Sequence, residues 1–509
     1  MAALPTKVSD LVRPWAERYP NQPALVEAAG TWTYKQLDSV VAVARDWLID
    51  CGVRPGDRVV LVGENSRAFV AVFLALTGID AWPVLVNARL SEREIDDIEH
   101  HCGARRVIYT TSVSQHATEH ARRRGAVIRE IGDLGPIGLG PLSENVEPEP
   151  VDSDSPEGVA ALIYTSGTTG IPKGVMLTHR NLLFVAAISA KLRSINHNDR
   201  LLGVLPMSHA VGLSVVLLGT LFGGGMLYLL PYFDSMTVRE ILQHERLTVL
   251  LGVPAMFTQF LEYAKLRKIK SLQFPELRII SSSGAPLHAA IKSAAEELFG
   301  LVLHNGYGVT ECSPTIALTR VESPRADTTV GPAFPGIEIK IAGANKKSVG
   351  EGEVGELWVR GPNVMKGYYR AAQETSAVID GDGWFNTRDL ARMHEGNLFI
   401  VGRTKELIVH LGFNVYPVEV EAVLNAYPGV VRAAVIGRSV HGSGEELVIA
   451  FVQLQPESST TVAELAKHAA QRLAPYKVPS QIHLMSEMPL TPTGKVMKEE
   501  LGRRLVNQR

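Results

Sequence analysis

The stretch YTSGTTGIPKG, residues 164–174, concentrates groups that bind phosphate. It holds three glycines, three threonines, a serine and a lysine. Glycine lets backbone N–H groups approach phosphate oxygens, and hydroxyl and ammonium groups add further donors. The stretch follows a short apolar run, AALIYT, of the kind that forms a buried strand. The pattern therefore predicts a phosphate-binding loop after a strand, with an ordinary surface loop as the alternative.

The loop departs from the glycine-rich motif of phosphotransferases, G-x-x-x-x-G-K-[ST]. Counting from Gly167, Pro172 stands at the second glycine position. After Lys173, Gly174 stands where a Ser or Thr would bind magnesium. The sequence therefore disfavours a kinase or ATPase of that class.

Four later stretches carry polar residues that could complete such a site: HNGYGVTECSP (304–314), GWFNTRDLA (383–391), GRTKELIVHLGFNVYPVEVE (402–421) and TPTGKVMK (491–498). Each alone has a simpler interpretation. Asp389 or Arg403 would be half of a surface ion pair, Tyr307 a core residue, and Lys495 a solvated lysine. Only their combination predicts a site.

Together with YTSGTTGIPKG, these stretches resemble the motifs of the adenylate-forming superfamily, in its acyl- and aryl-CoA synthetase branch. The resemblance covers nearly the whole chain and keeps the family's order. It implies that ATP converts a carboxylic acid into an acyl-adenylate with release of pyrophosphate, and that a thiol then accepts the acyl group. The implied small molecules are ATP, Mg²⁺, coenzyme A and a carboxylic acid.

The resemblance also implies roles at the nucleotide. The glycine-rich loop would bind the β- and γ-phosphates, and Glu311 would help to bind magnesium. Tyr307 would stack on adenine, Asp389 would accept the ribose hydroxyls, and Arg403 would reinforce that contact. The implied nucleotide-binding set is Thr165, Ser166, Gly167, Thr168, Thr169, Lys173, Gly284, Ala285, Pro286, Asn305, Gly306, Tyr307, Gly308, Thr310, Asp389, Arg403 and Lys495.

The same resemblance implies a mobile C-terminal domain with its hinge at Lys405. One orientation would deliver Lys495 to the carboxylate and the α-phosphate, and His209 would lie near the acyl carboxylate. The other orientation would present a tunnel for the thiol, formed by Leu411, Gly412 and Phe413. The implied acyl pocket comprises His209, Val211, Gly212, Leu213, Ser283, His304 and Gly306.

The segments implied to line the acyl pocket, residues 209–213, 281–285 and 304–306, contain no Lys, Arg, Asp or Glu. Because a buried substrate charge needs a partner, an apolar monocarboxylate, fatty or aromatic, is favoured over a dicarboxylate or an amino acid. Loading of a carrier protein's phosphopantetheine, in place of free coenzyme A, stays open.

Two positions depart from the family's pattern. Thr387-Arg388-Asp389 replaces the usual Thr-Gly-Asp, and Leu490 replaces a basic residue five positions before Lys495. Neither removes an implied contact, but both put the local loop geometry in question.

Composition limits the remaining possibilities. The chain has 509 residues, is 46% hydrophobic and 20% charged, and carries a net charge of −2, which supports folded domains and gives no reason to expect nucleic acid as a partner. Its three cysteines are far apart, and its N-terminus lacks a signal peptide's apolar core, so we expect a cytoplasmic protein. The sequence leaves a homodimer open.

Alternating apolar strands and helices predict an α/β fold with doubly wound parallel sheets. Strands are expected at residues 58–63, 106–110, 160–165, 248–253 and 278–283. We expect an N-terminal domain over residues 1–402, with a β-barrel-like part at about 330–400, and a small α+β domain over 403–509.

Two segments need separate interpretations. Residues 132–158, rich in Pro, Gly, Ser and acids, are predicted to be a long surface connection. Residues 201–233 contain no charged side chain and are long enough to cross a bilayer. Because proline and glycines divide this run, a buried strand–helix–strand unit is favoured over a membrane or lipid-binding segment.

Overall fold

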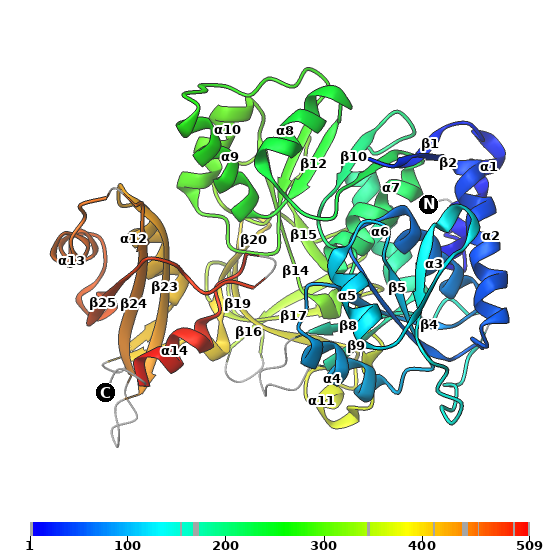
Figure 1. Cartoon of the computed structure of the whole chain (residues 1–509). Helices are drawn as coiled ribbons and strands as arrows, with labels where there is room; N and C mark the ends of the chain where they lie inside the picture. Colours follow the sequence, from blue (N-terminus) through cyan, green and yellow to red (C-terminus); the bar gives the residue numbers. More distant parts are fainter. Residues whose placement is uncertain are drawn as a thin grey trace.

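The computed structural model describes residues 4–506 apart from 153–154, 166–172, 344–346, 411–412, 440–445, 457 and 492–493. The predicted α/β class is confirmed. A large N-terminal part contains two eight-stranded sheets and a four-stranded sheet, and a smaller C-terminal part lies beside it (Figure 1).

The first large sheet has the strand order β15-β14-β13-β12-β10-β11-β1-β2. Its centre is parallel, and the end pairs β14/β15 and β1/β2 are antiparallel. Its strands are β1 (Pro23–Glu27), β2 (Gly30–Thr33), β10 (Arg200–Gly203), β11 (Met226–Leu229), β12 (Val249–Gly252), β13 (Ile279–Ser282), β14 (Leu303–Gly308) and β15 (Thr315–Leu318).

The second large sheet has the order β18-β9-β8-β4-β3-β5-β7-β6. The four central strands are parallel and the outer ones antiparallel, so the parallel sheets expected from the sequence have mixed edges. Its strands are β3 (Arg58–Gly63), β4 (Trp82–Asn87), β5 (Arg106–Thr110), β6 (Val127–Glu130), β7 (Pro136–Leu139), β8 (Val159–Thr165), β9 (Lys173–Thr178) and β18 (Gly367–Tyr368).

Two apolar helices, α3 and α6, pack in one large hydrophobic cluster with strands of both sheets. Of their residues, 10 of 12 in α3 and 11 of 14 in α6 are buried, as expected for helices that are apolar on most faces. The helices of the chain are α1 (Arg13–Arg18), α2 (Tyr34–Asp50), α3 (Arg67–Gly78), α4 (Glu92–Cys102), α5 (Gln115–Arg123), α6 (His179–Leu192), α7 (Gly219–Gly223), α8 (Ser235–His244), α9 (Pro254–Leu266), α10 (Ala289–Phe299), α11 (Ala372–Ser376), α12 (Pro417–Asn425), α13 (Val462–Ala470) and α14 (Lys498–Val506). Shorter turns are η1 (Val8–Leu11), η2 (Gly132–Leu134), η4 (Thr310–Cys312), η5 (Thr404–Glu406) and η6 (Pro475–Lys477), and η3 (Val211–Leu218) is a π-helix.

The β-rich segment expected near residues 330–400 is an antiparallel sheet of β16 (Glu338–Ala342), β17 (Gly355–Arg360), β19 (Phe385–His394) and β20 (Asn397–Arg403). The C-terminal part has its own apolar clusters. Its strands are β21 (Ile408–His410), β22 (Phe413–Val415), β23 (Val430–Ser439), β24 (Glu446–Leu454) and β25 (Gln481–Met485).

The uncharged run at residues 201–233 forms β10, η3, α7 and β11, with β10 and β11 paired in parallel. The predicted buried strand–helix–strand unit is therefore confirmed. Among the described residues, the helices are too short or too polar to cross a bilayer.

The prediction that residues 132–158 form only a surface connection is wrong. The segment contains β7, which pairs with β5 and β6 inside the second sheet. Two arginines, the buried Arg105 and the half-buried Arg106, hold the chain that follows: Arg106 Nη1 donates to Gly140 O at 2.7 Å, and Arg105 Nη1 donates to Ser143 O at 2.7 Å. Sequence composition missed this because the arginines bind the segment through its backbone carbonyls, which every residue carries.

Arg58 provides a test of this anchoring. Its side chain is 1% exposed and donates hydrogen bonds to the carbonyls of Gly56, Cys102, Gly103 and Glu147. Replacing it, Arg58→Met, leaves these carbonyls without their donor, so we expect a loss of at least about 3 kcal/mol in unfolding free energy, measured by urea denaturation.

The matched control is Arg180→Met, because Arg180 forms an ion pair with Glu157 that is about half exposed on both sides. Its loss should cost less than about 1 kcal/mol. Equal destabilisation by the two substitutions would contradict an anchoring role for Arg58.

Candidate functional site

The glycine-rich stretch connects two antiparallel strands, β8 and β9, with Thr165 opposite Lys173 and Tyr164 opposite Gly174. Residues 166–172 lie outside the described residues, and these include the predicted phosphate contacts Ser166, Gly167, Thr168 and Thr169. In phosphotransferases the loop leads into a helix, whereas here it leads into a strand. A Cβ at Gly174 would lie 3.1 Å from the Tyr164 ring, so this position serves packing.

Lys173 and Glu311, predicted for the phosphates and the metal, lie on either side of one tyrosine. The Lys173 ammonium is 5.1 Å from the centre of the Tyr368 ring, and the Tyr368 hydroxyl donates to Glu311 Oε1 at 2.8 Å. Tyr368 lies in β18, which pairs with β9. The sequence analysis missed Tyr368, because its contacts are 57 and nearly 200 residues away along the chain.

Asp389 is the centre of a second group. Its carboxylate is 3% exposed, accepts a hydrogen bond from the Tyr307 hydroxyl, and pairs with Arg403 Nε at 3.0 Å. Burial raises the pKa of Asp389, and the Arg403 guanidinium opposes this effect. Burial and the adjacent carboxylate raise the pKa of Tyr307 well above its usual value, so the hydroxyl stays a donor.

The local backbone explains why Asp389 points inward. In β19, residues 387–389 stand opposite the single residue Leu357 of β17, which makes a bulge with two extra residues. The Thr387 hydroxyl accepts from the Asp389 N–H at 3.1 Å and donates to Leu357 O at 2.9 Å. Arg388, at the position of the family's glycine, has φ = 59°, in the left-handed region. The bulge therefore keeps the glycine-like conformation although a side chain is present.

Lys495 comes from the C-terminal part and reaches the same group. It lies in a turn closed by Thr491 N–H donating to Lys495 O at 2.8 Å. Partial burial and the nearby Arg403 lower the pKa of Lys495, while Glu406 and Asp389 oppose the change. The side chain keeps access to solvent, so an anion could reach its ammonium. The structure thus brings Tyr307, Asp389 and Arg403 into contact, with Lys495 close enough for its charge to interact with Asp389 and Arg403, and their roles at a nucleotide stay a prediction.

The other predicted nucleotide residues occupy two strand ends. Gly284, Ala285 and Pro286 follow β13, and Thr310 lies in η4 directly after β14. Gly306 and Gly308 are in β14 itself. The Asn305 amide donates to the carbonyls of residues 328 and 329 at 3.0 and 3.2 Å, and only its Oδ1 is without a partner among the described residues. Asn305 can therefore only accept from a ligand.

The predicted acyl-pocket residues come from three segments. His209 follows β10, and burial lowers the pKa of its imidazole, which favours the neutral form. Val211, Gly212 and Leu213 begin the π-helix η3, where a Cβ on Gly212 would lie 2.1 Å from Pro206 O. Ser283 follows β13, and His304 shares one face of β14 with Gly306.

Of the predicted thiol tunnel, Leu411 and Gly412 lie outside the described residues. Phe413 is 54% exposed, and its ring stacks on Tyr476 at 4.4 Å between ring centres. Lys405, the predicted hinge, is exposed in η5, between the last strand of the N-terminal part and the first strand of the C-terminal part.

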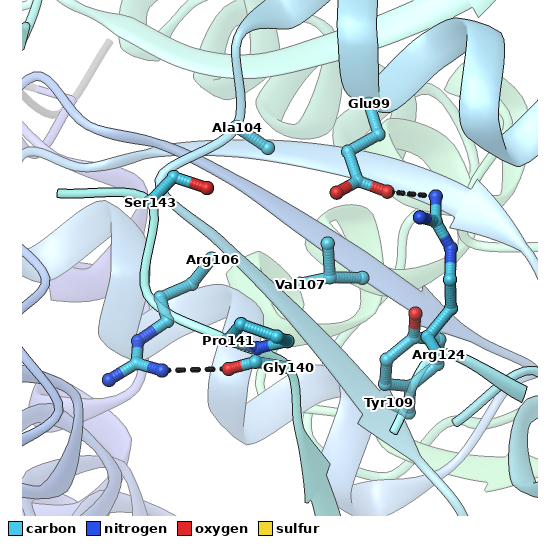
Figure 2. A pocket seen from close by; sticks show the side chains of 9 residues that line it. All are labelled: Glu99, Ala104, Arg106, Val107, Tyr109, Arg124, Gly140, Pro141 and Ser143. Atoms are coloured by element: carbon cyan, nitrogen blue, oxygen red, sulfur yellow. Dashed lines mark hydrogen bonds and ion pairs between the residues drawn. The ribbon is translucent and has the colours of Figure 1, made fainter. Parts of the chain in front are cut away.

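A separate small cavity of about 100 Å³ lies between α4, α5, β5 and the chain after β7 (Figure 2). Glu99 pairs with Arg124 at its edge, and Arg106 is bound to Gly140. The volume suits a few water molecules and is too small for a nucleotide. None of the predicted site residues lines it.

Comparison with protein families agrees with this geometry. The sequence model of the AMP-binding enzyme family matches residues 12–369, and that of the AMP-binding enzyme C-terminal domain matches residues 419–495. The first match alone covers more than half of the chain.

Individual relatives align over almost their whole length. Feruloyl-CoA synthase from Amycolatopsis is 34% identical over 96% of this chain and 97% of its own. Long-chain-fatty-acid–CoA ligase from Escherichia coli O157:H7 is 30% identical over 97% of this chain and 93% of its own length. ATP-bound MatB from Rhodopseudomonas palustris superposes with a TM-score of 0.84 at 29% identity, covering 97% of this chain and 98% of that chain.

The left-handed conformation of Arg388 generates a prediction. An L-residue pays roughly 1–2 kcal/mol in this region, and glycine pays little. We therefore expect Arg388→Gly to stabilise the protein by up to about 1 kcal/mol after the entropy cost of glycine, measured by urea denaturation.

Arg392→Gly is the control in the same strand, since Arg392 is not among the residues with positive φ. Glycine in an extended strand should destabilise by about 0.5–1 kcal/mol. If Arg388→Gly destabilises the protein as much as Arg392→Gly does, the strain interpretation is wrong.

Proposed function

Because this chain belongs to the AMP-binding enzyme family, we propose that it is an ATP-dependent acid–CoA ligase. In the first step, an oxygen of the substrate carboxylate attacks the α-phosphorus of ATP, the bond to the β-phosphate oxygen breaks, and pyrophosphate leaves. In the second step, the coenzyme A thiol loses its proton and attacks the acyl carbon, and AMP leaves. The observation that carries the proposal is the buried group of Tyr307, Asp389 and Arg403, with the charge of Lys495 from the C-terminal part acting on it.

Adenylation brings together two anions, the carboxylate and the triphosphate, so the site needs cations that act on the transition state. Lys495 supplies a mobile point charge for the attacking carboxylate and the α-phosphate. Lys173, at the base of the glycine-rich loop, supplies charge on the leaving side. Asp389 accepts hydrogen bonds from the ribose hydroxyls, and Arg403 and Tyr307 hold its carboxylate in place.

Magnesium fits this site only as an ion carried by the nucleotide. Among the described residues, no three His, Cys, Asp or Glu side chains gather closely enough to hold a metal ion. Mg²⁺ typically binds through one or two carboxylates together with substrate phosphates, and Glu311 is the available carboxylate. When bound, the ion would neutralise charge on the phosphates.

The family relatives support a fatty or aromatic acid as the substrate, since feruloyl-CoA synthase and a long-chain-fatty-acid ligase are both among them. We propose free coenzyme A as the acceptor and the cytoplasm as the location. A carrier protein's phosphopantetheine is the alternative acceptor, and thioester formation with coenzyme A alone distinguishes the two. We also propose that residues 1–402 and 403–509 move as separate domains about Lys405.

The function is tested with a panel of fatty and aromatic acids, each with ATP, Mg²⁺ and coenzyme A. We expect at least one acid to release equal amounts of AMP and pyrophosphate and to yield its coenzyme A thioester. Release of ADP, or the absence of pyrophosphate with every acid, would contradict the proposal.

The role of Lys495 gives a sharper prediction. Lys495→Ala should slow pyrophosphate release by at least about 100-fold, because a charge aimed at the transition state is lost. Thiolysis of a supplied acyl-adenylate should stay within about threefold of the wild type, because the other domain orientation performs that step.

Lys467→Ala is the matched control, since Lys467 is an exposed lysine of the same domain, in α13. It should leave both half-reactions unchanged. Equal losses of adenylation and thiolysis in Lys495→Ala would refute the two-orientation scheme.

A further inference from the structure

A buried cation lies at the C-terminal end of α6. Arg193 directly follows this helix and is 6% exposed. The mechanism above gives it no role. Arginine keeps its charge in proteins, so its burial requires partners that compensate for lost water.

The partners of Arg193 within the chain are too few. Nη1 donates to Ser189 Oγ at 2.7 Å and, more weakly, to Ser189 O at 3.4 Å. A guanidinium carries five N–H donors. Among the described residues, Nε and Nη2 find no acceptor, and no carboxylate pairs with the guanidinium. Neither nitrogen is among the fully enclosed polar atoms that lack a partner, so both keep some accessible surface and an acceptor from outside the chain can reach them.

The groups around Arg193 are also basic. Burial lowers the pKa of Arg193 to about 10, and the nearby Arg320 adds to this effect. The Arg320 guanidinium donates to Leu318 O and Ala333 O at 2.6 and 2.7 Å, so it adds positive charge near Arg193 and supplies no acceptor. Hydrogen bonding places Arg193 near the start of β13, because its carbonyl accepts from Arg278 Nη1 at 2.9 Å and Arg278 directly precedes that strand. β13 pairs with β14, with Ser281 opposite His304, and burial together with the guanidinium of Arg193 lowers the pKa of His304.

His304 connects Arg193 to the proposed acyl pocket. His304 and Gly306 are two residues apart in β14, so they share one face, roughly 7 Å apart. A Cβ on Gly306 would lie 3.7 Å from the Ser283 Cβ, so this face meets the chain that follows β13. Tyr307, beside Asp389, marks the nucleotide end of the strand.

The strand ends therefore define the direction in which a bound substrate would extend. Nucleotides bind beyond the carboxyl ends of parallel strands, and His304 lies near the amino end of β14. Arg193 likewise precedes β10 by a few residues. A substrate whose carboxylate reacts near Tyr307 would extend its other end past Gly306 and His304 toward Arg193.

We propose that Arg193 determines substrate specificity by donating hydrogen bonds to an oxygen at the far end of the carboxylic acid. This inference rests on the proposed function. The acid would combine an apolar body with a distal oxygen acceptor, either a phenolic or ether oxygen or a second carboxylate. An acid without this oxygen leaves the buried donors unpaired, and such sites discriminate strongly against the analogue that lacks the group.

Arg193 changes the predicted charge of the acyl pocket. The apolar pocket was predicted from residues 209–213, 281–285 and 304–306, which contain no Lys, Arg, Asp or Glu. Arg193 lies outside all three segments, so their composition could not reveal it.

The test uses matched acids that differ only at the far end. One set is cinnamate with 4-hydroxycinnamate and 4-methoxycinnamate, and the other is octanoate with octanedioate. A hydrogen bond to a charged group contributes about 1.5–3 kcal/mol, which corresponds to roughly 10- to 150-fold in kcat/KM. We expect the wild type to prefer an acid with the distal oxygen by such a factor in one set. The set that responds identifies a neutral oxygen or a carboxylate as the acceptor.

In Arg193→Met, the ratio of the two kcat/KM values should fall to about one. The activity on the acid with the distal oxygen should be lost, while the activity on the matched acid without it stays the same. Arg193→Lys should retain part of the preference. Ser189→Ala is the matched control, because it removes the hydroxyl partner of Arg193 and keeps the guanidinium, so the preference should persist. The ratio of two kcat/KM values does not depend on the fraction of folded enzyme.

A second readout is independent of catalysis: the Kd values of acyl-sulfamoyl adenosines with and without the distal oxygen, for the wild type and Arg193→Met. The same preference and the same loss are expected. The inference about Arg193 is overturned if the wild type shows no preference for the distal oxygen, or if Arg193→Met keeps that preference. In either case, pyrophosphate release would still support the ligase function. Failure to bind any analogue, with no pyrophosphate release, overturns both.

Discussion

The site depends on keeping one carboxylate, Asp389, buried and ionised. Burial works against its charge, and the Tyr307 hydroxyl and the Arg403 guanidinium compensate. Asp389 and Arg403 are opposite residues of β19 and β20, so sheet register alone holds the pair together. Lys495, from the C-terminal part, lies close enough to this cross-strand pair for the charges to interact. Under the proposed function, this ion pair would couple nucleotide binding to the position of the C-terminal domain.

The second constraint is the short chain between Tyr307 and Glu311. Tyr307 ends in the Asp389 group, and Glu311 ends in the group of Tyr368 and Lys173. The turn η4 follows β14 directly and separates the two side chains by only four residues. A nucleotide bound across this turn would meet the sugar-binding group at one end and the phosphate-binding group at the other. Under the further inference, Arg193 would donate to the opposite end of the acid.

Much of the architecture could be predicted from local pattern. The strands β3 and β5 have the predicted bounds, and β8, β12 and β13 differ by at most one residue at each end, because continuous apolar runs are typical of buried parallel strands. The segment at residues 132–158 was misjudged because its Pro, Gly and acidic residues conceal β7, which pairs with β5 and β6, and because Arg105 and Arg106 bind the following chain through backbone carbonyls. The sequence shows that Arg388 replaces the glycine of the family's Thr-Gly-Asp. Only the structure shows that Arg388 adopts the positive φ that a glycine would adopt in this bulge.

The sequence by itself determined the chemistry: the motifs around Lys173, Tyr307, Asp389 and Lys495 have residue types that suit ATP and a carboxylate, whatever their distances. The tertiary structure decided which of these side chains meet, because contacts across tens to hundreds of residues depend on strand order and register. It brought Tyr368 into contact with both Lys173 and Glu311, and it placed Lys495 within the electrostatic influence of Asp389. It also left Arg193 buried with unused donors, since burial and the lack of an acidic partner arise only when α6 packs into the core.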